Sequence, residues 1–131
     1  MREQFCTYEI SLKLKELGFD EPCLGYYEVS NYLEFGFRLR FIEHEDSNPS
    51  KQPSNKDCLA PLWQQVIDWF REKYKINCVV GYTDNDKEEF MAVIDRPNQD
   101  IDYNMNSTES YYEAREQTIL KALELIKNSE I

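Results

Sequence analysis

Residues 32–41 read YLEFGFRLRF, and every second side chain in this stretch is large and apolar. A period of two predicts a β-strand with one apolar face. Burying a Leu or Phe side chain contributes about 1.5 kcal/mol or more, so we expect helices to cover this face. The apolar members are Leu33, Phe35, Phe37, Leu39 and Phe41.

A shorter apolar stretch, LGYYEV at residues 24–29, precedes this strand and is separated from it by Ser30-Asn31. Ser and Asn are typical of tight turns between strands, so the two stretches predict an antiparallel hairpin over residues 24–42. A second hairpin is predicted over residues 76–95, where INCVVGYT and EEFMAVID flank a polar connection at 84–87.

Three stretches carry apolar residues with the period of a helix, at 8–17, 62–75 and 110–127. The resulting order, α-β-β-α-β-β-α, predicts an α+β fold in which antiparallel hairpins form a sheet packed against three helices. The hairpins would share one four-stranded sheet or form two layers around a common core. A chain of 131 residues fits one domain, predicted to span residues 1–131. Flexible polar loops are predicted at 43–60 and 96–109.

The helix ends carry local signals. Thr7 is a predicted N-cap, Gly18 a predicted C′ residue and Pro61 a predicted first residue of the second helix. The sequence from Ser110 to Glu113 predicts a capping box, in which each side chain bonds the other's backbone N–H. The predicted buried stripe of the second helix is Trp63, Val66, Ile67, Phe70 and Tyr74, and that of the third is Tyr112, Ile119, Ala122, Leu123 and Ile126.

Composition excludes several classes of site. The formal net charge of −10 disfavours general binding to nucleic acid, which is itself an anion. The four cysteines form no C-x-x-C pair and the chain has one histidine, so a four-ligand zinc site is disfavoured. No run of residues is long and apolar enough for a membrane span, and the N-terminus lacks the apolar region of a signal peptide. We therefore expect reduced thiols and a cytoplasmic protein.

Candidate chemistry is sparse. Residues 84–88 and 100–104 place oxygen-bearing side chains at alternate positions, as calcium loops begin, but both lack the glycine expected at the sixth position. Solvated turns are the favoured interpretation. His44 lies between acidic residues in a polar segment and is interpreted as solvated. No catalytic residue, cofactor site or metal site is predicted.

Two surfaces remain as candidates. Tyr32, Arg38 and Arg40 share the polar face of the strand at 32–41, where aromatic and basic groups would stack single-stranded bases. The alternative is an ordinary solvated face paired with acids on the neighbouring strand, such as Glu28. Another surface is suggested by apolar residues at the margins of the helical stripes, which mark a protein interface or else widen the core-facing stripe. These residues are Trp69, Tyr111 and Leu125.

Three segments carry a family resemblance: LKLKELGFDEPCLGYYE, APLWQQVIDWFREKYKI and YYEAREQTILKALELIKN. They resemble a group of small uncharacterised proteins encoded in gut bacterial genomes and in their prophages and mobile elements. The resemblance covers most of the chain, with the two polar loops as its variable parts. It implies a cytosolic accessory protein of bacterial or phage origin and transfers no catalytic residue.

These observations together predict a non-enzymatic protein that binds another macromolecule, expected to be a protein, either a different one or a second copy of the chain. An acidic inhibitor that imitates nucleic acid is one form of this hypothesis. Two alternatives stay open. One is a single-stranded nucleic-acid binder that uses the tyrosine and arginine face, and the other is an enzyme with a carboxylate-based site that no linear motif exposes.

Overall fold

The computed structural model describes residues 2–30, 36–42, 57–82, 89–97, 103–104, 108 and 110–129. The fold is α+β, and its longer helices and strands follow the predicted order. Contacts divide the chain into two compact units, Met1–Trp63 and Gln64–Ile131. The single domain expected over residues 1–131 remains a prediction. In the described residues, no helix combines the length and apolarity needed to cross a membrane.

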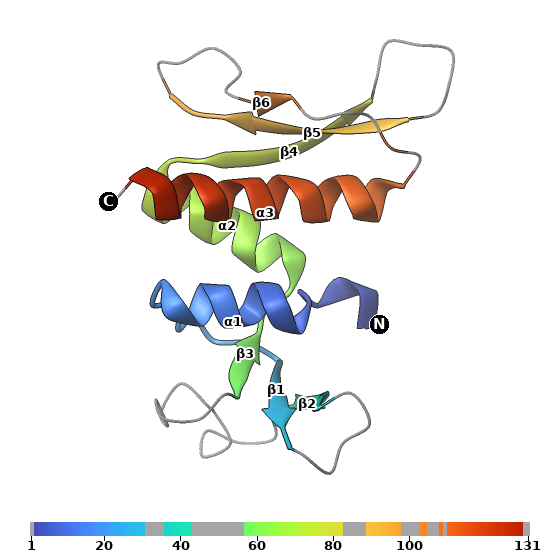
Figure 1. Cartoon of the computed structure of the whole chain (residues 1–131), viewed down its shortest axis with the longest axis vertical. Helices are drawn as coiled ribbons and strands as arrows, with labels where there is room; N and C mark the ends of the chain where they lie inside the picture. The colour runs from blue at the N-terminus through green and yellow to red at the C-terminus, as the bar shows by residue number, and fades with distance from the viewer. Residues whose placement is uncertain are drawn as a thin grey trace. The chain divides into compact units, whose positions relative to one another are not determined.

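The first unit begins with a short 3-10 helix, η1 (Arg2–Gln4), and the helix α1 (Tyr8–Glu16). Three strands follow, β1 (Gly25–Val29), β2 (Phe37–Phe41) and β3 (Cys58–Ala60), and they form an antiparallel sheet in the order β2-β1-β3. Figure 1 shows α1 beside the end of β3, with β1 and β2 beyond it. The buried cluster of this unit contains Phe5, Tyr27, Cys58 and Ala60.

The predicted caps of α1 are confirmed. The backbone N–H of Ile10 donates to Thr7 Oγ1 at 3.3 Å, so Thr7 is the N-cap. At the other end Gly18 has a φ of +91°, which a residue without a Cβ adopts readily. The Phe19 N–H then donates to the Leu14 carbonyl at 3.0 Å, and this is the bond that closes a Schellman motif.

The hairpin of β1 and β2 differs from its prediction in two ways. Val29 pairs with Phe37, so residues 30–36 connect the strands and the predicted two-residue turn at Ser30-Asn31 is wrong. The Ser30 N–H donates to the Gly36 carbonyl at 3.0 Å, which holds the two ends of this connection together. The apolar face of β2 is also only partly covered. Phe37 and Leu39 pack on the core cluster, whereas Phe41 is 57% exposed at the strand end.

The strand β3 lies inside the predicted loop 43–60, and this part of the prediction is wrong. Cys58, Leu59 and Ala60 are all buried. They pair with β1 in antiparallel register, Cys58 with Tyr27 and Ala60 with Gly25. Residues 43–56 lie outside the described residues. Pro61 precedes the next helix rather than opening it, because the Pro61 carbonyl accepts a hydrogen bond from the Cys6 N–H at 2.8 Å and Leu62 forms a bridge with Phe5.

The helix α2 (Trp63–Tyr74) begins with the last residue of the first unit. Trp63, Val66 and Phe70 are buried, as predicted, and Trp69 is buried with them. Ile67 and Tyr74, also predicted to be buried, are only partly so. The stripe therefore includes the side of the helix on which Trp69 lies, because positions 63, 66, 69 and 70 fall on one face at 3.6 residues per turn.

The second unit contains a sheet in the order β4-β5-β6, with β4 (Asn77–Tyr82), β5 (Phe90–Asp95) and β6 (Tyr103–Asn104), and the helix α3 (Tyr111–Ser129). Figure 1 shows α3 running along this sheet. Cys78, Ala92 and Ile94 are buried and share the face toward α3, since Cys78 pairs with Ile94 and Val80 pairs with Ala92. The strand β6 and Thr108 lie inside the predicted loop 96–109, so at residues 103, 104 and 108 the chain pairs with β5 where a flexible loop was predicted.

The buried stripe of α3 begins two residues later than predicted. Ile119, Ala122, Leu123 and Ile126 are buried as expected, but Tyr112 is 55% exposed. Ala114 and Thr118 fill the sheet-facing positions instead, and the Thr118 hydroxyl donates to the Val93 carbonyl at 3.1 Å.

Candidate functional site

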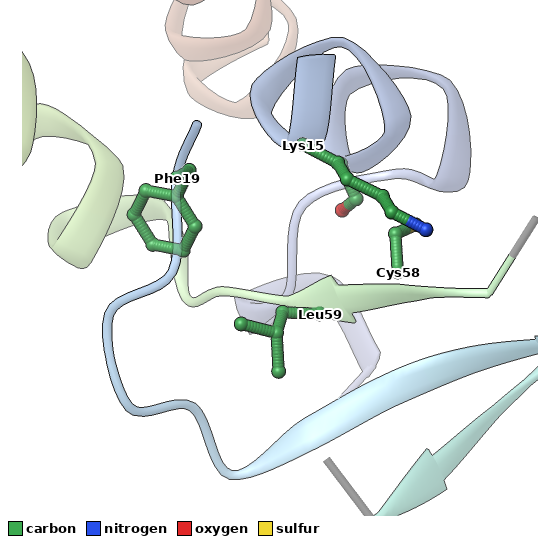
Figure 2. Close-up of a pocket in the computed structure, with 5 residues that line it drawn as sticks. Lys15, Phe19, Cys58 and Leu59 are labelled. Carbon is green, nitrogen blue, oxygen red and sulfur yellow. The ribbon is translucent and has the colours of Figure 1, made fainter. Parts of the chain in front are cut away.

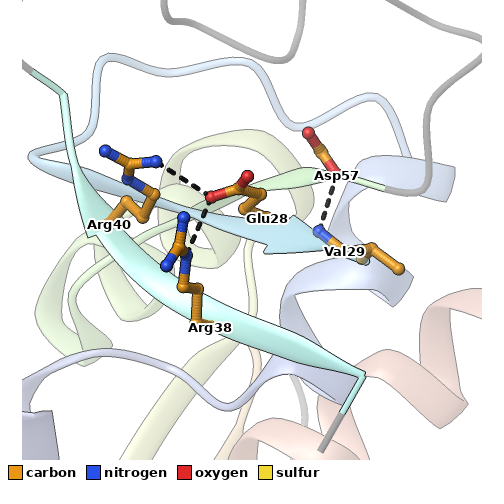
Figure 3. A network of polar contacts seen from close by, with 5 residues as sticks. All are labelled: Glu28, Val29, Arg38, Arg40 and Asp57. Carbon is orange, nitrogen blue, oxygen red and sulfur yellow. Dashed lines mark hydrogen bonds and ion pairs between the residues drawn. The ribbon is translucent and has the colours of Figure 1, made fainter. Parts of the chain in front are cut away.

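The predicted tyrosine and arginine face is occupied by an ion-pair network. Arg38 Nε lies 3.0 Å from Glu28 Oε2 and Arg40 Nη1 lies 3.2 Å from the same oxygen (Figure 3). Glu28 and Arg38 are direct partners in the register of β1 and β2. Both arginines therefore pair with the acid that the alternative interpretation named. Tyr32 lies outside the described residues.

Hydrogen bonds from Arg38 and then Arg40 hold the pKa of the Glu28 carboxyl below its ordinary value of 4.5. Glu28 thus stays ionised near neutral pH and offsets part of the charge of the two guanidinium groups. An anionic ligand would have to compete with this carboxylate for them, which disfavours nucleic-acid binding at this face. Beside the network, Asp57 Oδ1 accepts a hydrogen bond from the Val29 N–H at 2.9 Å (Figure 3).

All four cysteines are free. Cys58 lines a small cavity in the first unit together with Lys15, Phe19 and Leu59 (Figure 2), and Ser11 completes the lining. Burial raises the pKa of the Cys58 thiol to about 12. A thiol with this pKa stays protonated at neutral pH and is a poor nucleophile. Lys15 Nζ donates to the Asp57 carbonyl at 2.7 Å, so its ammonium is engaged in holding β3 to α1.

Cys78 and Cys23 are equally unreactive by this criterion. Burial raises the pKa of Cys78 to about 12, and its thiol donates to the Thr118 carbonyl at 3.8 Å. Burial also raises the pKa of Cys23 to about 12. Within the described part of the chain, no group of three His, Cys, Asp or Glu side chains is placed to hold a metal ion. His44, residues 84–88 and most of 100–104 lie outside that part.

The three residues of the predicted interaction surface do not lie together. Trp69 is 7% exposed, and its ring contacts those of Phe70 and Tyr74 with centroids 5.7 and 5.4 Å away. This burial favours its alternative role in the core-facing stripe. Leu125 is half-buried and lies about 21 Å from Tyr111 along the axis of α3. Tyr111 is 44% exposed and is the member of this set that contacts further exposed rings.

Tyr111 belongs to a row of four aromatic rings in the second unit, which we call the aromatic ladder: Tyr82, Phe90, Tyr111 and Tyr112. The centroids of successive rings are 5.0, 5.8 and 5.8 Å apart. Tyr82 is 74% exposed, and Phe90 is half-buried. Aromatic rings that contact one another are usually buried in a core. A contiguous row in which three tyrosines are exposed is therefore a candidate protein interface.

Backbone pairing fixes the ladder. Tyr82 and Phe90 face each other across the β4–β5 register. Phe90 also forms a two-bond bridge with Thr108, at 2.7 and 2.8 Å, which ties β5 to the segment before α3. Tyr111 then follows at the first position of α3. The rings are therefore carried by strand ends and a helix terminus, and a partner would meet a largely pre-organised surface.

The predicted capping box of α3 is made in part. The Glu113 N–H donates to Ser110 Oγ at 3.2 Å, as expected. The Glu113 carboxylate, however, accepts from the Thr108 hydroxyl at 2.8 Å, and the Ser110 N–H donates to that same hydroxyl oxygen at 3.4 Å. The predicted direct bond from the Ser110 N–H to the Glu113 carboxylate is therefore replaced by two bonds through the Thr108 hydroxyl. Thr108 links the cap of α3 to Phe90 and hence to the ladder.

A guanidinium packs against the α3 end of the ladder. The Arg115 guanidinium carbon lies 5.7 Å from the centroid of Tyr111 and 5.1 Å from that of Tyr112. Arg115 is only 8% exposed. Its charge is attracted by the negative faces of the rings, and its position one turn after Tyr111 and Tyr112 allows it to reach both. Arg115 is therefore buried together with Ala114 and Thr118 near the start of α3, where the sequence pattern predicted that Tyr112 would be buried.

Tyr111 alone among the ladder residues was predicted as a surface residue. The sequence did not place Tyr82 and Phe90 together, because the predicted four-residue connection at 84–87 would pair Tyr82 with Glu89. The structure pairs Tyr82 with Phe90, so the predicted length of this connection is wrong. The contact between Phe90 and Tyr111 depends on how α3 docks on the sheet, which no local pattern encodes. Comparison with family models, with curated proteins and with solved structures found no match to this chain.

Proposed function

We propose that this chain is a non-enzymatic accessory protein of bacterial or prophage origin, which acts in the cytoplasm by binding another protein through the aromatic ladder. The observation that carries the proposal is the row of four rings in mutual contact, three of them more than 40% exposed. Tyrosines concentrate binding energy at interfaces because they combine a large apolar area with a polar tip and few rotatable bonds.

Two further observations support protein as the partner. Arg38 and Arg40 of β2 form ion pairs with Glu28, so the basic groups of the face predicted to bind nucleic acid already have an anionic partner. The raised pKa of Cys58 and Cys78 keeps these thiols protonated, which supports a binding role over nucleophilic catalysis.

Site-specific photo-crosslinking tests the proposal. A photoreactive phenylalanine analogue is placed at Tyr82 in the full chain, and adducts are collected from lysate of a bacterial host that encodes it. The matched control places the same analogue at Val79, which is 44% exposed but lies on the opposite face of the sheet. We expect one protein to be captured from Tyr82 and not from Val79.

A second measurement separates binding from proximity. Tyr111→Ser should weaken the captured complex about tenfold or more, as loss of an interface anchor does. Equal adducts from Tyr82 and Val79, or adducts with a second copy of the chain alone, would contradict the proposal.

A further inference from the structure

We infer that the Tyr82 end of the aromatic ladder binds arginine side chains of a basic segment in its protein partner. This inference rests on the proposed function and adds the chemistry of the partner. Three observations support it: the contact of Arg115 with the ladder, the negative charge of the second unit, and the exposure of Tyr82.

The ladder accepts a guanidinium in the folded chain itself. Arg115 lies against Tyr111 and Tyr112 within 6 Å of each ring centroid, the range in which a cation is attracted to a ring face. Arg115 is 8% exposed, so its guanidinium packs against these rings largely out of contact with water. Arginine suits such sites better than lysine, because its planar group stacks on rings and is less strongly hydrated.

The charge of the second unit favours a basic partner. Residues 64–131 contain 14 acidic and 8 basic side chains, which gives a formal charge of −6. Two of the acids directly adjoin the ladder in described segments: Glu89 precedes Phe90, and Glu113 lies in the first turn of α3. A basic segment would be drawn to this surface at a rate that falls with added salt.

The helix terminus decides which end of the ladder an incoming cation would occupy. The N-terminus of α3 carries partial positive charge, and Arg115 already lies at Tyr111 and Tyr112, so a second cation is disfavoured there. Tyr82 lies at the far end, two ring contacts from Tyr111, and is the most exposed ring of the four. Its ring, adjacent to that of Phe90, is the available binding surface.

Titration with two peptides tests this inference. Oligoarginine and oligolysine of equal length are titrated into the full chain, and dissociation constants are measured by calorimetry at low and moderate salt. We expect oligoarginine to bind about threefold to tenfold more tightly. Tyr82→Leu should remove this preference by lowering the affinity for oligoarginine more than that for oligolysine, while Tyr82→Phe, which keeps the ring face, should retain it.

Equal affinities for the two peptides, or a preference that survives Tyr82→Leu, would overturn the inference. Circular dichroism of each variant, which alters an exposed side chain, checks that the fold is intact. The outcome is separable from the proposed function. Adducts from Tyr82 without an arginine preference would leave protein binding standing and remove only the basic partner, whereas absence of Tyr82 adducts would count against protein binding itself.

Discussion

Of the two glycines in described strands, Gly25 of β1 and Gly81 of β4, Gly25 has the closer neighbours. A Cβ built there would lie 3.0 Å from the Arg40 carbonyl oxygen and 3.4 Å from both Leu39 Cδ1 and Phe5 Cε1. A real Cβ needs more space, and the nearest atom belongs to the backbone of β2, which cannot move without disturbing the sheet. We therefore expect Gly25→Ala to lower the free energy of unfolding by about 1–3 kcal/mol, as other overpacked sites do.

Urea denaturation of both variants checks this expectation, with Gly81→Ala as the matched control. Gly81 is also a strand glycine, but its added Cβ would meet only Met91 Cγ at 4.0 Å. That variant should be neutral or more stable by up to about 1 kcal/mol, because alanine has less conformational freedom to lose on folding. Equal destabilisation at the two sites would show that close approach at Gly25 is not the cause.

At the scale of elements, the start of α3 depends on Thr108 as much as on its own cap. Ser110→Ala should cost about 1 kcal/mol, because the Glu113 N–H loses its acceptor. Thr108→Val should lower stability by a similar amount, since it removes the hydroxyl that donates to Glu113 and accepts from Ser110. Thr108→Ser keeps that hydroxyl and should cost less.

A double-mutant cycle on Thr108→Val and Glu113→Ala, measured by chemical denaturation, tests the link directly. We expect a coupling of about 0.5 kcal/mol or more, because the two side chains share a hydrogen bond. Additive losses would indicate that Thr108 acts only through its backbone bridge to Phe90.

The same scale shows what the sequence could predict. The caps at Thr7 and Gly18, the helices and most of the longer strands follow from signals within a few residues and match their predictions to within two residues. The strand β2 is the exception, because it begins at Phe37 and not at residue 32 as predicted. The strands β3 and β6 were not predicted, because three and two residues are too short to show alternation, and the partner of β3 is also distant in sequence. The exposure of Phe41 and the contact of Phe90 with Tyr111 depend on tertiary packing, which the spacing of apolar residues cannot predict.

At the scale of the whole molecule, both units contain buried thiols whose ionisation opposes folding. Burial raises the pKa of Cys58 in the first unit and of Cys78 in the second from the ordinary 9.0 to about 12. Above pH 9 the unfolded chain releases these protons and the folded chain retains them, so stability is full below pH 9 and falls as the pH rises. Each thiol should contribute about 1.4 kcal/mol per pH unit to this loss.

Denaturation between pH 7 and pH 11 checks the alkaline loss in the wild type, in Cys58→Ala and in Cys78→Ala. Each variant should show a shallower dependence on pH, whatever its stability at pH 7. The slope is the informative quantity, because removing a buried thiol also changes packing. Slopes parallel to that of the wild type would contradict the role of the thiols.

Asp57 has a consequence for how the chain tolerates change. Its carboxylate holds the Val29 N–H and its carbonyl holds Lys15, while Ile42 is fixed by the bond from its N–H to the Leu24 carbonyl. The two ends of residues 43–56 are therefore anchored independently of what joins them. For a flexible loop the entropy of closure grows only with the logarithm of its length, so doubling the length costs about 0.6 kcal/mol. An insertion between Ile42 and Asp57 that leaves the bonds of these two residues in place is therefore expected to cost the first unit little stability, which would let this position accept a grafted epitope.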